Sequence, residues 1–577
     1  MVELPITMNS LRPTIDAKIN NRDAKFLLDS GAFYSMISSA TAAEYNLKTV
    51  PGPYGLRVTG IGGAADVGVA TVKEFSIVGL IIKNLDFLVG GSEVGNAGLL
   101  GQNFLEKFDV EYDLAAGAIR LFKTEDCGHT RLAYWLTPEQ DYSSMPIERI
   151  EPMRPHTIGV AYVNDKKIRV EFDTGAFTSV LSLKAAERAG VRPDSPGVVA
   201  SGYARCIGRG MTREYIAPFA SFKIGDGEEI KNAKLRIADI ELGEADMLIG
   251  ADFFISHRIF VANKEGKLFL SYNGGPVFNL SQKRPEQTAP GPEDQPADQP
   301  EAQADGAVQA DNSGAASPSQ AADLARRGSA LAARRDFGPA VADLSKAIEL
   351  SPNDPEFYYQ RAETYSASGQ MDRALTDYNR VLTLKRDFLP AYIPRAEIEL
   401  AKGDMHSAIA DLEAVDRLAP KQADLRLMLA KLYGRIDRMP AAIEQFSLWI
   451  QNHPDDSRML AARAGRCLSS ALQNQDLATA MSDCNSALRT ADKKDRNYSN
   501  LFVDRGLVHL RQGNYDKAIA DFNDAFKMTP TNARALYARA VAESRKNEKK
   551  DSASDVEAAK QIAPEVAKSF ERYGIVP

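Results

Sequence analysis

Two segments of the sequence place an aspartate in the same chemical setting. Each is an apolar run that leads into Asp-Ser/Thr-Gly-Ala, with Asp29 and Ser30 in the first segment and Asp173 and Thr174 in the second, 144 residues later. An apolar run that ends at a glycine-bearing turn predicts a strand followed by a tight turn. The sequence therefore predicts two aspartates, each delivered by a strand into a turn.

A second paired element follows each aspartate at a nearly equal distance. Its glycine is Gly101 in the first copy, 72 residues after the aspartate, and Gly250 in the second copy, 77 residues after it. Each copy then runs into a further predicted strand, at 108–113 and at 259–263. The two stretches are therefore interpreted as copies of one lobe.

Two carboxyl groups suit the hydrolysis of a peptide bond without a covalent intermediate. One carboxylate activates a water, while the other carboxyl protonates or polarises the carbonyl group of the substrate. Two carboxyls that share one water cannot both ionise easily, so Asp29 and Asp173 would share a proton and titrate as a pair. This chemistry predicts activity at mildly acidic pH.

These motifs resemble those of the aspartic peptidases, specifically of the retropepsin-like family. The resemblance covers about residues 3–275 and implies an all-β, bilobal domain made of two tandem lobes. It implies that two aspartates react and that the following Ser/Thr-Gly pairs support the catalytic loops, the hydroxyls by hydrogen bonds across the lobe interface and the glycines by tight turns. The residues in these roles are Asp29, Asp173, Ser30, Gly31, Thr174 and Gly175.

A glycine-bearing segment lies between the two elements of each lobe. In the resembled family a β-hairpin at this place closes over the substrate, so the resemblance implies two flaps, with an ordinary surface hairpin as the alternative. The flap residues are Gly60, Ile61, Gly62 and Gly63 in the first lobe and Gly202 and Tyr203 in the second. Because Tyr203 and Arg205 have no counterparts near Ile61, we expect the two sides of the cleft to select different substrate side chains.

Composition changes sharply between the two halves of the 577-residue chain. The stretch 285–320 has six prolines, seven acidic residues and no aromatic residue, so it cannot bury enough apolar surface to offset its ordering entropy. We interpret it as a flexible acidic linker. Such a linker predicts that the second half is not fixed rigidly against the first.

After the linker, small residues recur at an interval of 34, at Gly328, Ala362, Ala396 and Ala430. A 34-residue helix-turn-helix unit with small residues where its two helices touch resembles the tetratricopeptide repeat. About seven copies are expected over roughly 321–566, with an insertion in one of them. Such solenoids present a concave groove that usually holds peptide or protein, and an array that only spaces or dimerises the protein is the alternative.

The motifs and the composition divide the chain into five predicted segments. They are a first lobe at 1–125, an inter-lobe connection at 126–155, a second lobe at 156–280, a disordered acidic linker at 281–320 and an all-α solenoid at 321–577. Since both lobes lie in one chain, one molecule is expected to suffice for a two-aspartate site.

Charge and cysteine content exclude other classes of function. The net charge of −7 gives no overall positive field for nucleic acid, and no apolar run approaches the roughly 18 residues of a membrane span. No cofactor or metal site is expected, because the histidines are scattered and no Cys-x-x-Cys pair occurs. The four cysteines, interpreted as small buried apolar residues, are Cys127, Cys206, Cys467 and Cys484.

Together the two halves predict an aspartic endopeptidase whose repeats recruit a protein substrate or partner. The alternative is a catalytically silent scaffold in which both halves bind polypeptide. The segment 1–10 has no basic region followed by an apolar core, so no signal peptide is expected in this chain. A bacterial, exported protein would fit the combination, and the compartment stays open between periplasmic or secreted, with a signal removed, and cytoplasmic.

Overall fold

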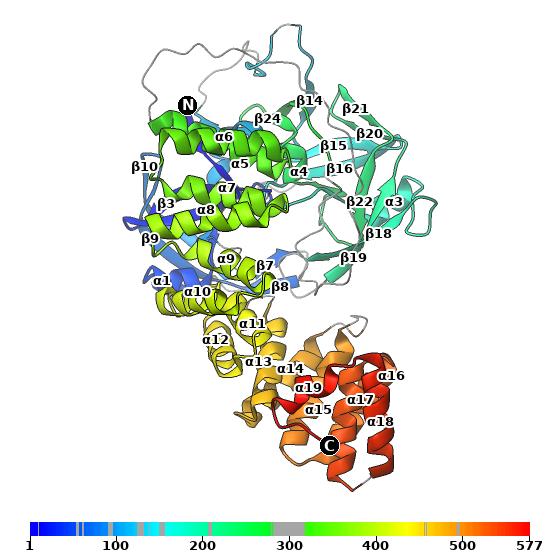
Figure 1. Cartoon of the computed structure of the whole chain (residues 1–577). Coiled ribbons are helices and arrows are strands. Elements are labelled where there is room, and N and C mark those ends of the chain that lie inside the picture. Colours follow the sequence, from blue (N-terminus) through cyan, green and yellow to red (C-terminus); the bar gives the residue numbers. More distant parts are fainter. Residues whose placement is uncertain are drawn as a thin grey trace.

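The computed structural model contains a β-rich N-terminal half and a helical C-terminal half (Figure 1). The fold class expected from the sequence, an all-β bilobal domain followed by an all-α solenoid, is confirmed. The structure describes residues 1–9, 11–52, 57–60, 63–90, 96–123, 132–137, 139–148, 156–205, 211–278, 280, 318–454, 456, 458–491, 493, 497–547 and 549–577.

The first lobe is built around an eight-stranded sheet of described residues, in the order β2-β3-β4-β11-β5-β10-β9-β6. The bounds of its elements are β2 Thr7–Asn9, β3 Arg12–Ile19, β4 Arg22–Leu28, β5 Met36–Ile37, α1 Ser39–Glu44, β6 Thr49–Pro51, β7 Arg57–Gly60, β8 Gly63–Asp66, β9 Gly68–Ile77, β10 Leu80–Val89, β11 Gly98–Leu100 and α2 Gln102–Leu105. Strand β11 lies parallel to β4 and antiparallel to β5, which places the second paired element beside the strand that carries Asp29.

The second lobe repeats this plan in a nine-stranded sheet, in the order β18-β19-β22-β17-β23-β16-β15-β20-β21. Its elements are β15 Ile158–Val163, β16 Lys166–Phe172, β17 Val180–Ser182, α3 Leu183–Arg188, β18 Val199–Arg205, β19 Met211–Pro218, β20 Ser221–Ile224, β21 Glu228–Lys231, β22 Lys234–Ala238, β23 Met247–Ile249 and α4 Ala251–Phe254. The order β16-β23-β17-β22 matches β4-β11-β5-β10 in pairing and direction, so the sequence duplication is also a structural one.

A third sheet joins the lobes, in the order β1-β13-β12-β24-β25-β14. Its elements are β1 Val2–Pro5, β12 Asp109–Asp113, the 3-10 helix η1 Leu114–Ala116, β13 Ala118–Phe122, β14 Ser143–Pro146, β24 His257–Ala262 and β25 Lys267–Tyr272. Each lobe contributes a hairpin, and β12 pairs with β24 across the boundary. The expected connection at 126–155 is thus partly structured, because β14 forms an edge strand of this sheet.

A buried carboxylate stabilises the junction of the two hairpins. Glu111 on β12 is fully buried and forms ion pairs with Arg120 of its own hairpin and with Arg258 on β24. The Arg258 guanidinium donates two hydrogen bonds to Oε1 of Glu111, at 3.0 and 2.7 Å. The two lobes are therefore joined both by a shared sheet and by the ion pair between Glu111 and Arg258.

The helical half consists of seven consecutive helix pairs and a final short helix within the described residues. They are α5 Pro318–Ala333, α6 Phe337–Leu350, α7 Pro355–Ala367, α8 Met371–Leu384, α9 Leu389–Ala401, α10 Met405–Leu418, α11 Arg426–Arg435, α12 Met439–Asn452, α13 Met459–Gln473, α14 Leu477–Thr490, α15 Tyr498–Arg511, α16 Tyr515–Met528, α17 Ala533–Arg545, α18 Lys549–Ile562 and α19 Val566–Glu571. Helix α5 begins three residues before the expected end of the linker, so 318–320 are helical.

The 34-residue interval reflects contacts between the two helices of a pair. A Cβ on Gly328 would lie 2.7 Å from the side chain of Leu344, and a Cβ on Gly506 would lie 2.5 Å from the ring of Phe522. Only a very small residue on the first helix lets the large residue of the second helix approach so closely.

In the fifth pair a disulfide takes the place of this contact. Cys467 and Cys484, on α13 and α14, are bonded with their Cα atoms 5.7 Å apart. Both side chains are buried, as expected from the sequence, but their interpretation as small apolar residues missed the bond. Sequence reasoning weighed only short cysteine motifs, and 17 residues separate these two.

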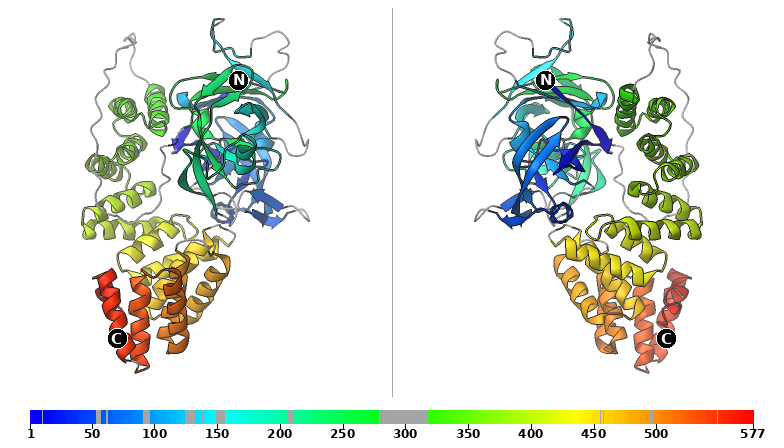
Figure 2. Two further views of the ribbon diagram at one scale, coloured as in Figure 1. Left: turned by 90° about the vertical axis from the view of Figure 1, so that its right-hand side faces the viewer. Right: turned by 90° about the vertical axis from the view of Figure 1, so that its left-hand side faces the viewer.

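The solenoid docks on the first lobe through its first helix. Helix α5 packs against β2 and η1, the amide of Met8 donates to Oγ of Ser329 at 3.3 Å, and Ala330 is fully buried in the core of the β half. In both views of Figure 2 the first helices of the solenoid, in green, lie beside the β half. The residues 281–317 lie outside the described part, but the expectation of two halves that are not held together differs from this packed contact.

Candidate active site

Asp29 and Asp173 directly follow the last residues of strands β4 and β16, and the second paired element fixes each aspartate. The backbone amide of Asp29 donates to the carbonyl oxygen of Leu100 at 3.0 Å, and the amide of Asp173 donates to that of Ile249 at 2.9 Å. The short strands β11 and β23 therefore determine where each strand ends and its turn begins.

Four hydrogen bonds link the two turns across the lobe boundary. The hydroxyl of Ser30 donates to the carbonyl oxygen of Phe172 at 2.8 Å, and the hydroxyl of Thr174 donates to that of Leu28 at 2.7 Å. Each hydroxyl also accepts from the amide of the other, both at 3.0 Å. All of these groups are buried, so the four bonds hold the lobes in one register.

Each turn glycine lies against the carboxyl group of the other lobe. A Cβ on Gly31 would lie 2.3 to 2.6 Å from the carboxyl atoms of Asp173, and a Cβ on Gly175 would lie at the same distances from those of Asp29. No side chain fits there without displacing a carboxyl. The structure thus brings both expected aspartates and both Ser/Thr-Gly pairs together at one place.

The backbone of each turn also orients its own carboxyl. Oδ1 of Asp29 accepts from the amides of Gly31 and Ala32 at 3.0 and 2.9 Å, and Oδ1 of Asp173 accepts from those of Gly175 and Ala176 at 2.8 and 3.1 Å. The two carboxyls are therefore held in related orientations by related bonds.

Burial and mutual proximity make ionisation of the two carboxyls unequal. Desolvation raises the pKa of Asp29, although a hydrogen bond from Asp173 and the charge of Arg12 lower it in part. Desolvation, followed by the charges of Asp29 and Glu171, raises the pKa of Asp173 well above its usual value. One proton on the pair at mildly acidic pH is the arrangement that these environments favour.

One further side chain supports each turn, Asn103 in the first lobe and Asp252 in the second, and the sequence analysis gave neither of them a role. The amide of Ser35 donates to Oδ1 of Asn103, and the amide of Ser179 donates to Oδ1 of Asp252, both at 2.8 Å. Burial raises the pKa of Asp252 to about 6. The signal for this support was the second residue after each glycine of the second paired element, which is Asn in one lobe and Asp in the other.

Hairpins occupy both positions assigned to the flaps. Gly60 and Gly63 face each other across β7 and β8, while Ile61 and Gly62 lie outside the described residues. In the second lobe β18 pairs with β19, with a bulge at Gly202 and the backbone of Tyr203 opposite Arg213. Both hairpins point towards the lower edge of the β half in Figure 1.

A ladder of arginines connects successive helix pairs of the solenoid. The guanidinium of Arg361 donates to Asp377 of its own pair and to Ser345 of the preceding pair. The corresponding ion pairs elsewhere are Arg327–Asp343, Arg395–Asp411, Arg466–Asp483, Arg505–Asp521 and Arg539–Asp555. Compared with the regular 34-residue spacing of these Arg–Asp pairs, the expected insertion is divided among three places. Three extra residues lie before Arg466, one lies between Arg466 and Asp483, and four lie between Asp483 and Asp521.

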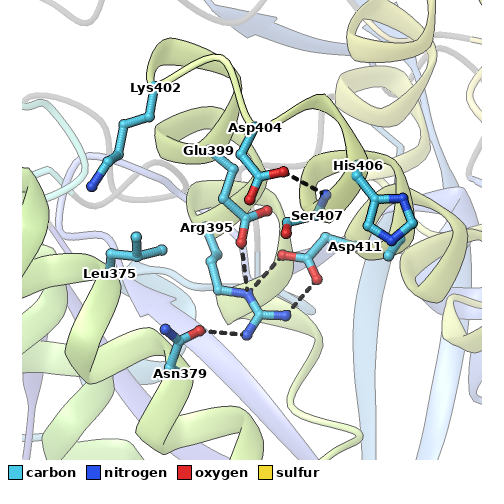
Figure 3. A pocket seen from close by; sticks show the side chains of 10 residues that line it. Leu375, Asn379, Arg395, Glu399, Lys402, Asp404, His406, Ser407 and Asp411 are labelled. Carbon is cyan, nitrogen blue, oxygen red and sulfur yellow. Dashed lines mark hydrogen bonds and ion pairs between the residues drawn. The ribbon is translucent and has the colours of Figure 1, made fainter.

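One member of the ladder lines a cavity of about 530 Å³ between α8, α9 and α10 (Figure 3). There Arg395 is paired with Asp411 and donates to Asn379, and Glu399 lies 3.8 Å from its guanidinium. A second cavity of about 630 Å³ lies between α14 and α15, with Tyr498 and Phe502 among its lining residues. The solenoid thus offers mixed polar and aromatic hollows of the size of several side chains.

Within the described ranges, the structure groups no three His, Cys, Asp or Glu side chains in a way that could hold a metal ion. Nor does any helix of the described residues combine the length and the apolar character that crossing a membrane requires.

Comparison with protein families gives matches in both halves. Residues 15–104 and 160–253 match a family model described as aspartyl protease. Residues 344–376, 399–465 and 503–567 match models described as tetratricopeptide repeat. Among curated proteins, none matches the chain.

Several solved structures are similar to parts of the chain. YrrB, a tetratricopeptide-repeat protein described as having an unusual peptide-binding site, is 21% identical, with a TM-score of 0.30, over 34% of this chain and 97% of YrrB. A tetratricopeptide-repeat protein from Parabacteroides merdae is 16% identical, with a TM-score of 0.31, over 44% and 98%. The C-terminal part of another, from Cytophaga hutchinsonii, is 15% identical, with a TM-score of 0.31, over 43% and 98%.

Proposed function

Because the β half carries two tandem aspartyl-protease lobes and the helical half carries tetratricopeptide repeats, we propose that the protein is an aspartic endopeptidase. Asp29 and Asp173 are the proposed catalytic residues. The observation that carries the proposal is the position of each turn glycine against the opposite carboxyl, which sets both carboxyls at one place. Intact hydroxyl bonds across the boundary support it further.

In the proposed reaction a water binds between the two carboxyl groups. The ionised carboxylate removes a proton from this water, whose oxygen attacks the peptide carbonyl carbon, while the neutral carboxyl donates its proton to the carbonyl oxygen. The tetrahedral intermediate then expels the amine, which takes up the proton that the first carboxylate received, while a hydroxyl group of the intermediate returns its proton to the second carboxylate. Ser30, Gly31, Thr174 and Gly175 hold the two carboxyls at the spacing that the reaction needs.

The hairpins at Gly60 to Gly63 and at Gly202 and Tyr203 are proposed as flaps over an extended polypeptide. The solenoid is proposed to recruit a protein substrate or partner, which its 34-residue repeats and mixed polar and aromatic hollows suit. No cofactor, metal or nucleic acid enters this proposal.

Cleavage-site profiling on a proteome-derived peptide library, at several values between pH 3 and pH 7, tests the proposal. We expect cleavage by the full chain with an optimum below neutral pH, and none by Asp29→Asn or Asp173→Asn. Asp239→Asn removes an exposed carboxyl of the second lobe and is the matched control. A full chain that is folded and inert throughout, yet binds polypeptide, would establish the silent scaffold instead.

A further inference from the structure

The two lobes exchange a second pair of contacts beside the aspartates. Arg12 precedes Asp29 by 17 residues, and His156 precedes Asp173 by the same number. The guanidinium carbon of Arg12 lies 4.1 Å from the ring centroid of Phe177 in the second lobe. The ring centroids of His156 and Phe33, a residue of the first lobe, are 3.9 Å apart.

The contacts follow the pseudo-twofold relation, since Phe33 and Phe177 each lie four residues after their own aspartate. Each lobe therefore lays a nitrogen-bearing side chain over the catalytic turn of the other. The geometry is shared, but the chemistry is not. Arginine keeps its positive charge at every pH of interest, whereas histidine gains and loses its charge near neutral pH.

A second difference lies two residues before each aspartate, where the first lobe has Leu27 and the second has Glu171. Glu171 is buried, with its Oε1 atom 2.6 Å from Nδ1 of His156. A buried carboxylate next to Asp173 has no counterpart next to Asp29. The charge of Arg12 acts to lower the pKa of Asp29, and the charge of Glu171 acts to raise the pKa of Asp173.

These charges favour opposite protonation states. A cation favours the ionised form of a nearby carboxyl, and an anion favours the neutral form. Tyr112 is the remaining titratable group that acts on the pair, and burial raises the pKa of its hydroxyl, so it is neutral over the range in question. Arg12 and Glu171 therefore carry the asymmetry, and His156 is the residue that lies against Glu171.

We propose that this asymmetry divides the two roles, so that Asp29 is the carboxylate that takes the proton of the water and Asp173 is the acid that protonates the substrate carbonyl. Arg12 and Glu171 are positioning residues for the shared proton, and His156 is the side chain in contact with Glu171. The inference rests on the proposed hydrolytic function for its reaction, but the location of the proton does not depend on turnover.

The causes of the pKa shifts agree in direction with this assignment. After desolvation and the charge of Asp29, Glu171 raises the pKa of Asp173, and Arg12 acts to lower that of Asp29. Nδ1 of His156 lies 2.6 Å from Oε1 of Glu171, so a permanent cation at the position of His156 would offset the charge of Glu171.

The pH profile of kcat/KM on a short peptide, measured with the full chain, tests the assignment. Glu171→Gln should lower the apparent pKa of the alkaline limb by about one unit and leave the acid limb in place, since a nearby negative charge raises the pKa of a carboxyl and its removal lowers it again. His156→Arg should also lower the alkaline limb. Arg12→Gln should raise the acid limb by about one unit.

Arg12→Lys is the matched control, because it keeps the charge and should leave both limbs within a few tenths of a unit of the wild type. A merely structural role would reduce kcat at every pH with both limbs in place. Folded Glu171→Gln and Arg12→Gln variants with unmoved limbs, or with limbs moved in the opposite directions, would overturn the assignment.

A second readout separates this inference from the proposed function. The full chain labelled with carbon-13 at the aspartate carboxyls is titrated by NMR, and the two resonances are assigned by their loss in Asp29→Asn and Asp173→Asn. Asp29 should ionise in the lower step and Asp173 in the upper step. If the wild type hydrolyses nothing, the proposed function fails but the titration still decides; the reverse order of ionisation would refute the assignment even in an active enzyme.

Discussion

The first lobe has Leu27, Arg12 and Asn103 at three positions around its aspartate, where the second lobe has Glu171, His156 and Asp252. The backbone around these residues is the same in both lobes, from the strand order to the hydrogen bonds that hold each carboxyl. Two of the differences, Glu171 and Asp252, place a carboxyl in the second lobe where the first has none, and the third exchanges Arg12 for His156. Duplication thus supplied equal geometry, and substitution supplied the unequal charges that an acid and a base require.

The largest effect on stability is expected from a substitution at the junction of the two lobes. Glu111→Gln removes the buried carboxylate that pairs with Arg120 and Arg258. We expect a loss of about 3 kcal/mol in the free energy of unfolding, because the two arginines would lose their buried partner and keep in common only the more distant carboxylate of Asp113, at 3.5 and 3.6 Å. Glu3→Gln, which removes an exposed partner of Arg120, is the control and should cost less than about 1 kcal/mol. Denaturant titration of both variants measures the difference, and equal costs would contradict the account.

A pair of reciprocal substitutions sharpens the difference between Asn103 and Asp252. Burial raises the pKa of Asp252 from 3.8 to about 6 in the folded state, so the folded protein binds this proton more tightly than the unfolded chain. Stability from this group is therefore full below about pH 4 and is lost as the pH rises to about 6, by roughly 3 kcal/mol in all.

Asp252→Asn should remove this fall in stability with pH, and Asn103→Asp should add a second one of similar size. Unfolding free energies measured between pH 4 and pH 7 decide the matter. An unchanged pH dependence in Asp252→Asn would show that this carboxyl does not titrate in that range.

Substitutions of the two turn glycines test whether the two lobes are equivalent in shape around the carboxyl groups. A methyl group on Gly31 would displace the carboxyl of Asp173, and one on Gly175 would displace that of Asp29. We expect Gly31→Ala and Gly175→Ala each to lower kcat/KM by about 100-fold, as displacements of about 1 Å can do. Gly338→Ala, on α6 with open space around it, is the control. A large loss in only one of the two glycine variants would show that the lobes are not equivalent in shape.

The smallest effect is expected from removing the solenoid, which packs against the first lobe. Truncation after Gln282 uncovers the surface of the first lobe where α5 packs, and leaves β20 and β21 of the second lobe as they are. Amide exchange in β2 and η1 should become about tenfold faster, which corresponds to roughly 1.4 kcal/mol of local stability. Exchange in β20 and β21 is the internal control. Equal rates in β2 with and without the solenoid would show that the contact adds no stability.

The sequence allowed the aspartates, the hydroxyls and the glycines to be identified together because duplication is a local signal that occurs twice. Each motif of about ten residues determines its own strand and turn, and two copies imply that they meet. The support from Asn103 and Asp252 was present in the same motif, but its role depends on a bond to Ser35 or Ser179, more than 60 residues away.

Contacts between segments that share no pattern could not be predicted. Arg12 and Phe177 belong to different lobes, and no periodicity relates them. The docking of α5 depends on a few small residues, such as Ala330, whose burial against β2 looks in the sequence like burial within a helix pair. The bond between Cys467 and Cys484 joins two helices across 17 residues of sequence, a separation that belongs to no short cysteine motif.

The central claim is that one chain forms one complete two-aspartate site. The most direct test measures the specific activity on a short peptide of the wild type over a dilution series to nanomolar enzyme, beside an equal mixture of Asp29→Asn and Asp173→Asn chains. We expect constant specific activity on dilution and no activity in the mixture. Activity that falls on dilution and returns on mixing the two variants would contradict the claim, because the working site would then form between two molecules.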